Sequence, residues 1–208
     1  MFAATELLAF LSAVLVLVLV PGPNTMVLLA QSLGGGRRAG LATVAGIETG
    51  TLAHTLAAAL GLSVLLSTSP LAFQLVKFAG VVYLIVIGLR TLLQPLPQLS
   101  QVAGISTAEA FRRGLMGNLL NPKAALFFLG FIPQFIHLER GRVFLQFVIL
   151  GCIVVFVGAC FGSLLSITAS GIASWLRQHS SFVRWQQRLT GSMLILIAGW
   201  IALAWPSS

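Results

Sequence analysis

Four polar side chains that could bind ions or polar solutes stand inside long apolar stretches of the sequence. They are Asn24, Glu48, Asn121 and Lys123. Three of them belong to helix-breaking motifs, Pro21-Gly22-Pro23-Asn24 and Asn121-Pro122-Lys123. A carboxylate, an ammonium group and two amides could together hold a charged or polar molecule, because hydrogen bonds to ionised groups are the strong ones. They can do so only if the elements that carry them bring them together.

The composition predicts an integral membrane protein. Of the 208 residues, 58% are hydrophobic and 8% are charged, whereas a soluble domain has about 45–50% apolar and about 25% charged residues. The apolar residues form long runs, and a helix needs about 20 such residues to cross a bilayer. Unbroken runs such as Leu11 to Val20 argue against the alternating pattern of a β-barrel strand. We therefore predict an all-α polytopic membrane protein.

Six apolar runs are long enough to be transmembrane helices. They are Leu7 to Leu33, Leu41 to Leu66, Pro70 to Leu93, Gly114 to Ile136, Val143 to Thr168 and Leu189 to Trp205. Because the first run is long and broken by prolines, a five-span arrangement with a re-entrant first segment stays open.

The basic residues predict the orientation. With six spans, the connectors after the first, third and fifth spans face the same side of the membrane, and they or their flanks carry most of the arginines. The opposite side has only Arg140 and Arg142. Since Lys and Arg accumulate in cytoplasmic loops, we expect both termini outside, in the periplasm if the protein lies in the inner membrane of a Gram-negative bacterium. The basic residues behind the net charge of +8 are scattered at the ends of apolar runs, which argues against nucleic acid as a partner.

The two halves of the chain share a pattern. Residues 1–93 and 114–208 would each form a three-helix repeat, joined by a cytoplasmic linker, 94–113, in which Ser106 and Glu109 fit a helix capping box. The first and fourth spans both contain a proline motif, and the third and sixth share the spacing of a basic residue and two glycines. An odd number of spans per repeat makes the second repeat inverted relative to the first.

The two proline breaks predict a shared polar site. A proline frees backbone groups that hydrocarbon cannot satisfy, so each break should face protein or a cavity, and paired breaks form the substrate site of many secondary transporters. Counted from the cytoplasmic ends at about 1.5 Å per residue, Glu48 and Asn121 lie about 10 Å deep, Lys123 about 13 Å and Asn24 about 15 Å. We expect Glu48 and Lys123 to meet as an ion pair. Packing kinks and a snorkelling Lys123 are the structural alternatives.

Other residues whose side chains could take part in chemistry are interpreted as structural. His54 lies six positions beyond Glu48 and off its helical face, so we interpret it as a core histidine rather than a proton relay. Cys152 and Cys160 are too far apart for a disulfide if they share a helix, and we expect both to be buried apolar residues. The scattered histidines and cysteines form no constellation for a metal, a cofactor or an enzyme nucleophile.

The motif Pro21-Gly22-Pro23-Asn24, the segment LLAQSLGGGRRAGLATVAGIETG after it and above all GLMGNLLNPKAALFFLGFIPQFI from Gly114 resemble the lysine-exporter (LysE/RhtB) family of bacterial amino-acid exporters. The resemblance extends over the whole chain. It implies an inner-membrane carrier that expels an amino acid or a similar metabolite in exchange for protons. The family's motif residues would correspond to Asn24, Asn121, Pro122 and Lys123, and its membrane acid to Glu48.

Together these observations predict a secondary transporter whose substrate is a small molecule. Lys123 would bind the carboxylate of an amino acid and Glu48 its ammonium group, and protonation of Glu48 would couple export to proton entry. With one acid inside a span, a neutral substrate is slightly favoured. A channel or cation exporter, a membrane enzyme and a non-transporting scaffold are the alternatives. The oligomeric state stays open, because the glycine pairs Gly46–Gly50 and Gly158–Gly162 could pack helices within or between subunits.

Overall fold

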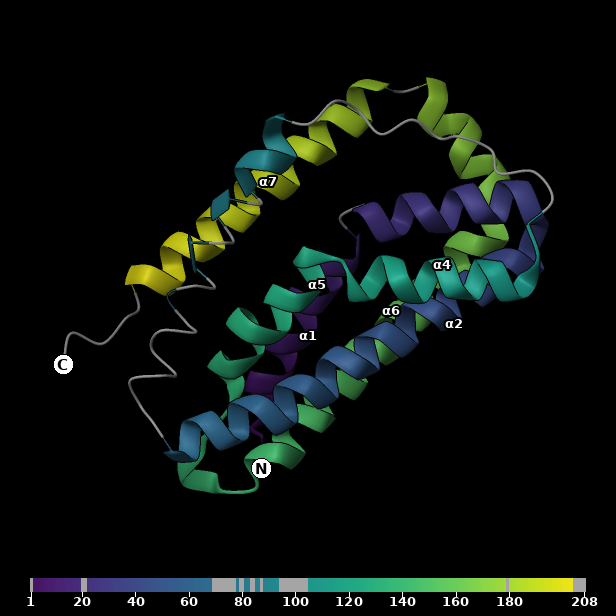
Figure 1. The fold of residues 1–208 in the computed structure, drawn as a ribbon. Coiled ribbons are helices and arrows are strands. Elements are labelled where there is room, and N and C mark those ends of the chain that lie inside the picture. The colour runs from purple at the N-terminus through teal and green to yellow at the C-terminus, as the bar shows by residue number, and fades with distance from the viewer. Residues whose placement is uncertain are drawn as a thin grey trace.

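The chain folds into helices in the computed structural model (Figure 1). The structure describes residues 2–19, 22–68, 78, 81–82, 85–86, 88–93, 105–178 and 180–203. Every element within these ranges is a helix and none is a strand. The prediction of an all-α protein is therefore confirmed for the part of the chain that the structure describes.

The first broken element consists of α1 (Ala4–Leu19) and the beginning of α2 (Pro23–Thr68). α1 ends just before the first proline motif. Pro23 begins α2, a position that tolerates proline because the first amide of a helix has no partner inside the helix. Val20 and Pro21 lie outside the described residues. The helix break is thus found where the sequence predicts it.

α2 bends sharply at Gly36, so that it consists of two arms (Figure 1). Gly36 has φ 70° and ψ −171°, a backbone conformation that is essentially restricted to glycine. Leu28 on the first arm and Val44 on the second pack in one buried apolar cluster with Leu165. The first arm corresponds to the end of the first predicted span and the second arm to the second span. The connector expected between them is a bend within continuous helix.

The second broken element has several short pieces. They are α4 (Thr107–Leu119), α5 (Pro122–Leu126), the π-helical η1 (Phe127–Phe131) and the 3-10 helices η2 (Ile132–Phe135) and η3 (Leu138–Arg140). The Asn121 side chain caps α5 by accepting a hydrogen bond of 3.0 Å from the Lys123 amide, as asparagine does at helix starts. The chain bends by 56° between α4 and the segment that begins at Lys123. Here too the break lies at the predicted motif.

α4 begins earlier than the predicted fourth span. Its first residue is Thr107 rather than Gly114, so the last part of the predicted linker is helical. The reason is local: Ser106 caps the helix by accepting a hydrogen bond of 3.2 Å from the Glu109 amide, which is one half of the predicted capping box. The Glu109 carboxylate binds Arg112 and Arg113 instead of the amide of Ser106.

Two long helices complete the described structure, α6 (Val143–Gln178) and α7 (Ser180–Leu203). Among the described residues, one helix is long and apolar enough to cross a bilayer, Val143–Ala169 within α6, or two if α4 and its bent continuation count as one span. α7 contacts residues 88–93, where the Gln187 side chain donates a hydrogen bond of 2.7 Å to the Thr91 carbonyl. Most of the third predicted span, Pro70 to Leu93, lies outside the described residues, so the six-span arrangement stays a prediction.

The two broken elements run in opposite directions, as contacts at five points along them show. Contacts between them are, in order, Glu6 with Arg140, Phe10 with Phe135, Gly22 with Lys123, Asn24 with Asn118 and Gly35 with Ile105. Residue numbers rise along one element while they fall along the other, which defines the opposite direction. The two breaks, at Gly22 and Lys123, therefore lie beside each other.

Candidate functional site

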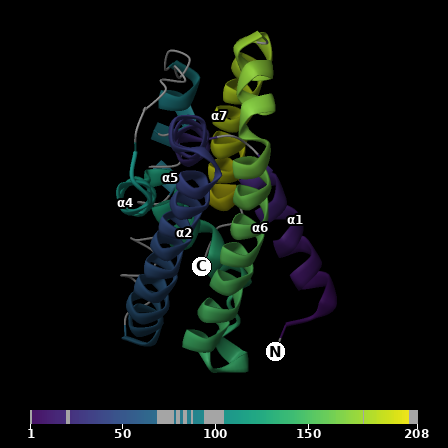
Figure 2. The same cartoon turned by 90° about the vertical axis from the view of Figure 1, so that its right-hand side faces the viewer.

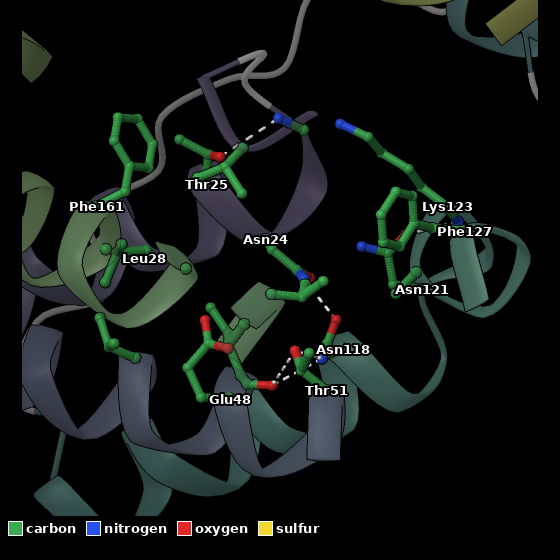
Figure 3. Close-up of a pocket in the computed structure, with 18 of the residues that line it drawn as sticks. Asn24, Thr25, Leu28, Glu48, Thr51, Asn118, Asn121, Lys123, Phe127 and Phe161 are labelled. Atoms are coloured by element: carbon green, nitrogen blue, oxygen red, sulfur yellow. Dashed lines mark hydrogen bonds between the residues drawn. The ribbon is translucent and has the colours of Figure 1, made fainter. Parts of the chain in front are cut away.

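A cavity of about 140 Å³ lies where the two breaks meet (Figure 3). Its wall comes from the end of α1, both arms of α2, the junction of α4 and α5, η1, and the middle of α6. The polar side chains in this wall are Asn24, Thr25, Glu48, Thr51, Asn118, Asn121 and Lys123. A cavity of about 150 Å³ holds a molecule the size of benzene, and one water occupies about 30 Å³ in the liquid. The cavity therefore has room for a small solute or a few water molecules.

The structure brings the predicted site residues together. Asn24, Glu48, Asn121 and Lys123 all line the cavity, as does Gly22 of the first motif. Pro23 and Pro122 begin α2 and α5 and so place the starts of these helices next to it. Pro21 lies outside the described residues.

Asn118 links three segments of the site and was not predicted from the sequence. Its side chain accepts a hydrogen bond of 2.8 Å from the Asn24 amide group, and donates to the Ile47 carbonyl at 2.7 Å and to the Thr51 hydroxyl at 2.9 Å. Only 2% of Asn118 is exposed. Figure 3 shows Asn24, Asn118 and Thr51 facing one another. One signal could have found it: Asn118 lies three residues before Asn121, about one helical turn before the Asn121-Pro122-Lys123 motif.

The Glu48 carboxyl lies at the side of the cavity formed by α6. A Cβ atom added to Gly158 would lie 2.5 Å from Glu48 Oε1 and 3.0 Å from its Cδ. The carboxyl therefore rests against a stretch of α6 backbone that carries no side chain. Both residues line the cavity.

The Lys123 ammonium group lies at the other side, next to the break between α1 and α2. A Cβ atom added to Gly22 would lie 3.7 Å from Lys123 Nζ. Figure 3 shows the Lys123 amine and the Glu48 carboxyl far apart across the cavity. The predicted ion pair between them is therefore wrong. Depth along a span places residues at one level, but the two side chains point to different neighbours at that level.

The remaining chemistry-bearing residues border the site or face away from it. His54 Nε2 lies 3.1 Å from the Asn118 carbonyl oxygen, and its ring stacks on Phe128, which agrees with a core histidine. Cys152 and Cys160 are free and exposed, so their predicted burial is wrong. α6 turns its glycines toward α2 and thereby turns these cysteines outward. Among the described residues, no group of three His, Cys, Asp or Glu side chains could hold a metal ion.

The sequence matches the LysE type translocator family over residues 15–204. The chain belongs to this family. The matched range contains every cavity residue named above. As a member of the LysE type translocators, the protein is a membrane transporter and not an enzyme, and the family resemblance drawn from the proline motifs is confirmed.

Curated relatives of this LysE type translocator cover nearly its whole length. An uncharacterized membrane protein of Pseudomonas aeruginosa is 31% identical over 84% of this chain and 84% of its own. The uncharacterized membrane protein YrhP of Bacillus subtilis is 29% identical over 91% of this chain and 95% of its own. The leucine efflux protein of Salmonella typhimurium is 28% identical over 93% of this chain and 92% of its own. No solved structure matches the chain significantly.

Proposed function

We propose that this translocator exports a neutral amino acid across the bacterial inner membrane and that the cavity is its binding site. The observation that carries the proposal is the cavity itself, which holds Glu48 on one side and Lys123 on the other, between two broken helices that run in opposite directions. A relative named as a leucine efflux protein supports an amino acid as the cargo.

The Lys123 side of the cavity suits the carboxylate of the substrate. The Lys123 ammonium group lies beside Gly22, next to the start of α2. The first amides of a helix have no partner within the helix, and the helix dipole is positive at this end. Gly22 has no side chain that could block the approach of an anion. A substrate carboxylate would bind between Lys123 and the start of α2.

The Glu48 side of the cavity suits the ammonium group of the substrate. A carboxylate is the natural acceptor for an amine, and charge-assisted hydrogen bonds are about twice as strong as neutral ones. Apart from its polar residues, the cavity wall is lined by apolar side chains, which include Leu28, Phe127 and Phe161. No second acid lines the cavity among the described residues, so a cationic side chain would find no counter-charge. The site therefore favours an amino acid with an apolar, uncharged side chain.

Proton coupling is part of the proposal. Glu48 would take up a proton from outside when the cavity is empty and release it to the cytoplasm when a substrate ammonium group binds. A membrane-embedded charge without a counter-ion costs at least about 2.5 kcal/mol. Either a proton or a substrate amine removes this cost, so the two would bind to Glu48 alternately. Alternate occupancy of one carboxylate is what makes a carrier an exchanger.

The arrangement in the membrane is proposed to be two inverted three-helix repeats, residues 1–93 and 114–208, with both termini in the periplasm. Arg37 and Arg38, next to the bend of α2, and Arg112 and Arg113 on α4 gather near the end where Gly35 meets Ile105. Glu6 and Arg140 are at the opposite end of the paired elements. An arginine-rich end fits the cytoplasmic side.

Counterflow in proteoliposomes tests the proposal. The purified protein is reconstituted in vesicles loaded with unlabelled leucine, and uptake of labelled leucine is measured with and without a pH gradient. We expect counterflow, and we expect the gradient to drive net transport. Glu48→Gln should abolish the response to the gradient, whereas Glu109→Gln, which changes an acid outside the cavity, should retain it.

Two results would contradict the proposal. Absence of counterflow for leucine and other neutral amino acids, with leucine accumulation outside overproducing cells also unchanged, would exclude a neutral amino-acid carrier and favour a cation exporter, a channel or a scaffold. Undiminished pH-driven transport by Glu48→Gln would remove Glu48 from the coupling role.

A further inference from the structure

α6 presents a row of glycines to the second arm of α2, with which it runs side by side (Figure 2). Gly151 faces Thr55, Gly158 faces Glu48 and Gly162 faces Val44. Small residues let membrane helices approach closely, which explains such a row as packing. At Gly158, however, the opposing group is a carboxyl group and not a hydroxyl or methyl group that packs against the helix.

The contact at Gly158 involves only the carboxyl group of Glu48. The three atoms nearest to an added Cβ are Oε1 at 2.5 Å, Cδ at 3.0 Å and Oε2 at 3.1 Å. Real Cβ atoms essentially never approach a neighbour closer than 3.0 Å. An alanine at 158 would therefore displace the carboxyl group, whereas the same change at Gly162 would meet Val44 Cγ2 at 3.0 Å and touch no charged group.

We propose that Gly158 is a positioning residue that seats the Glu48 carboxyl group against α6, opposite Lys123. This inference rests on the proposed function, in which Glu48 alternately holds a proton and the substrate amine. The bare backbone at Gly158 fixes how far the carboxyl group stands from Lys123 and so sets the separation of the two charges that the site can bind.

Few titratable groups surround this carboxyl. Lys123 faces it from α5 across the cavity, His54 lies on α2 behind Asn118, and the described residues of α6 contribute no titratable side chain to the cavity wall. A methyl group at position 158 would therefore act on Glu48 by displacing it, since it brings no new charge to the site.

The test compares Gly158→Ala with Gly162→Ala and Gly61→Ala in the reconstituted full-length protein. Leucine counterflow gives KM, and initial rates between pH 5 and 9 give the pH profile. A displacement of about 1 Å in a binding group reduces activity by up to about a hundredfold, so we expect Gly158→Ala to raise KM about tenfold or more and to shift the pH profile. Gly162→Ala crowds the cavity and should change KM without moving the profile. Gly61 has no atom within 4 Å of its added Cβ, and Gly61→Ala should change neither.

A rescue experiment distinguishes the positioning of the Glu48 carboxyl group by Gly158 from a general effect on helix packing. Aspartate is one methylene shorter than glutamate, so Glu48→Asp combined with Gly158→Ala should recover part of the KM and of the pH profile that Gly158→Ala loses. Two results would overturn the inference. In the first, Gly158→Ala has a KM within twofold of the wild-type value and an unshifted pH profile. In the second, the double variant has a KM and a pH profile no closer to the wild type than those of Gly158→Ala alone. Since Glu48→Gln tests the role of Glu48 independently, either result leaves the proposed function intact.

If Gly158→Ala does not accumulate in the membrane, a comparison of stabilities tests whether the cause is the clash with the Glu48 carboxyl group. Gly158→Ala is then introduced into a Glu48→Ala background, and the thermal midpoints of the purified variants are compared. A clash with the carboxyl group predicts that Gly158→Ala is tolerated once that group is removed. Equal loss of folded protein in both backgrounds would show that Gly158 is needed only for helix packing.

Discussion

Replacing Asn118 by leucine should destabilise the junction of the two broken helices. The substitution removes three side-chain hydrogen bonds, those to Asn24, Ile47 and Thr51, whose lengths are 2.8, 2.7 and 2.9 Å. Side-chain hydrogen bonds within membrane proteins contribute about 0.6 kcal/mol each on average, and in proteins generally about 1 kcal/mol. The expected loss in the free energy of unfolding is therefore about 2–3 kcal/mol.

The assay is thermal unfolding of the purified protein in detergent. For a chain of this length, each kcal/mol changes Tm by roughly 2–4 °C, so Asn118→Leu should lower Tm by roughly 4–12 °C. Gln134→Leu is a suitable control, because it removes one hydrogen bond of 2.9 Å to the Gly130 carbonyl within the same broken element. Its effect should be at most about half as large.

A double-mutant cycle isolates the bond between the two broken elements. Asn24→Ala and Asn118→Leu each remove the same 2.8 Å hydrogen bond, so their combined effect should be smaller than the sum of the single effects. A Tm for Asn118→Leu within about 1 °C of the wild type would refute the reasoning from its three bonds. Strict additivity would show that Asn24 and Asn118 stabilise the fold separately.

Further predictions concern backbone strain, substrate charge and pH. Gly36→Ala should lower the free energy of unfolding by about 1–3 kcal/mol because alanine disfavours its φ of 70°, whereas Gly61→Ala, in an open helical position, should raise Tm slightly. Lys123→Gln should raise KM for leucine about tenfold or more, and an amine without a carboxylate should not compete for counterflow by the wild type. The hydrogen bonds from Arg140 lower the pKa of Glu6, just outside the first predicted span, from 4.5 to about 2. The stabilisation by this carboxylate is complete above pH 4.5 and is lost as the pH falls toward 2, and Glu6→Gln should reduce that part of the pH dependence of Tm.

Features with local causes could be predicted from the sequence. A proline can begin a helix but cannot continue one, so the breaks before Pro23 and Pro122 follow from the residue type alone. The cap at Ser106 follows from a spacing of three residues. The shared cavity followed from one additional step, the cost of unsatisfied polar groups in hydrocarbon.

Features that depend on the rotation of one helix against another could not be predicted. The level of Glu48 and Lys123 could be counted along the chain, but their directions depend on how other segments pack: the Glu48 carboxyl lies beside Gly158 and the Lys123 ammonium group lies beside Gly22. The expected ion pair failed for this reason. Asn118 was missed because the fourth span was expected to begin at Gly114, which placed this residue close to the surface, whereas α4 begins about two turns earlier at Thr107.

The two ends of the paired elements are held by different kinds of contact. Beyond the cavity toward Glu6, Phe10 packs in an aromatic cluster with Phe127, Phe131 and Phe135, and each such pair contributes about 0.5–1.5 kcal/mol beyond its burial. Toward the arginine-rich end, α4 packs closely against the second arm of α2, because Gly46 and Gly114 leave no room for a side chain between the two helix backbones. Under the proposed orientation, loading of substrate from the cytoplasm would have to separate these helix contacts, whereas its release would have to separate the aromatic rings.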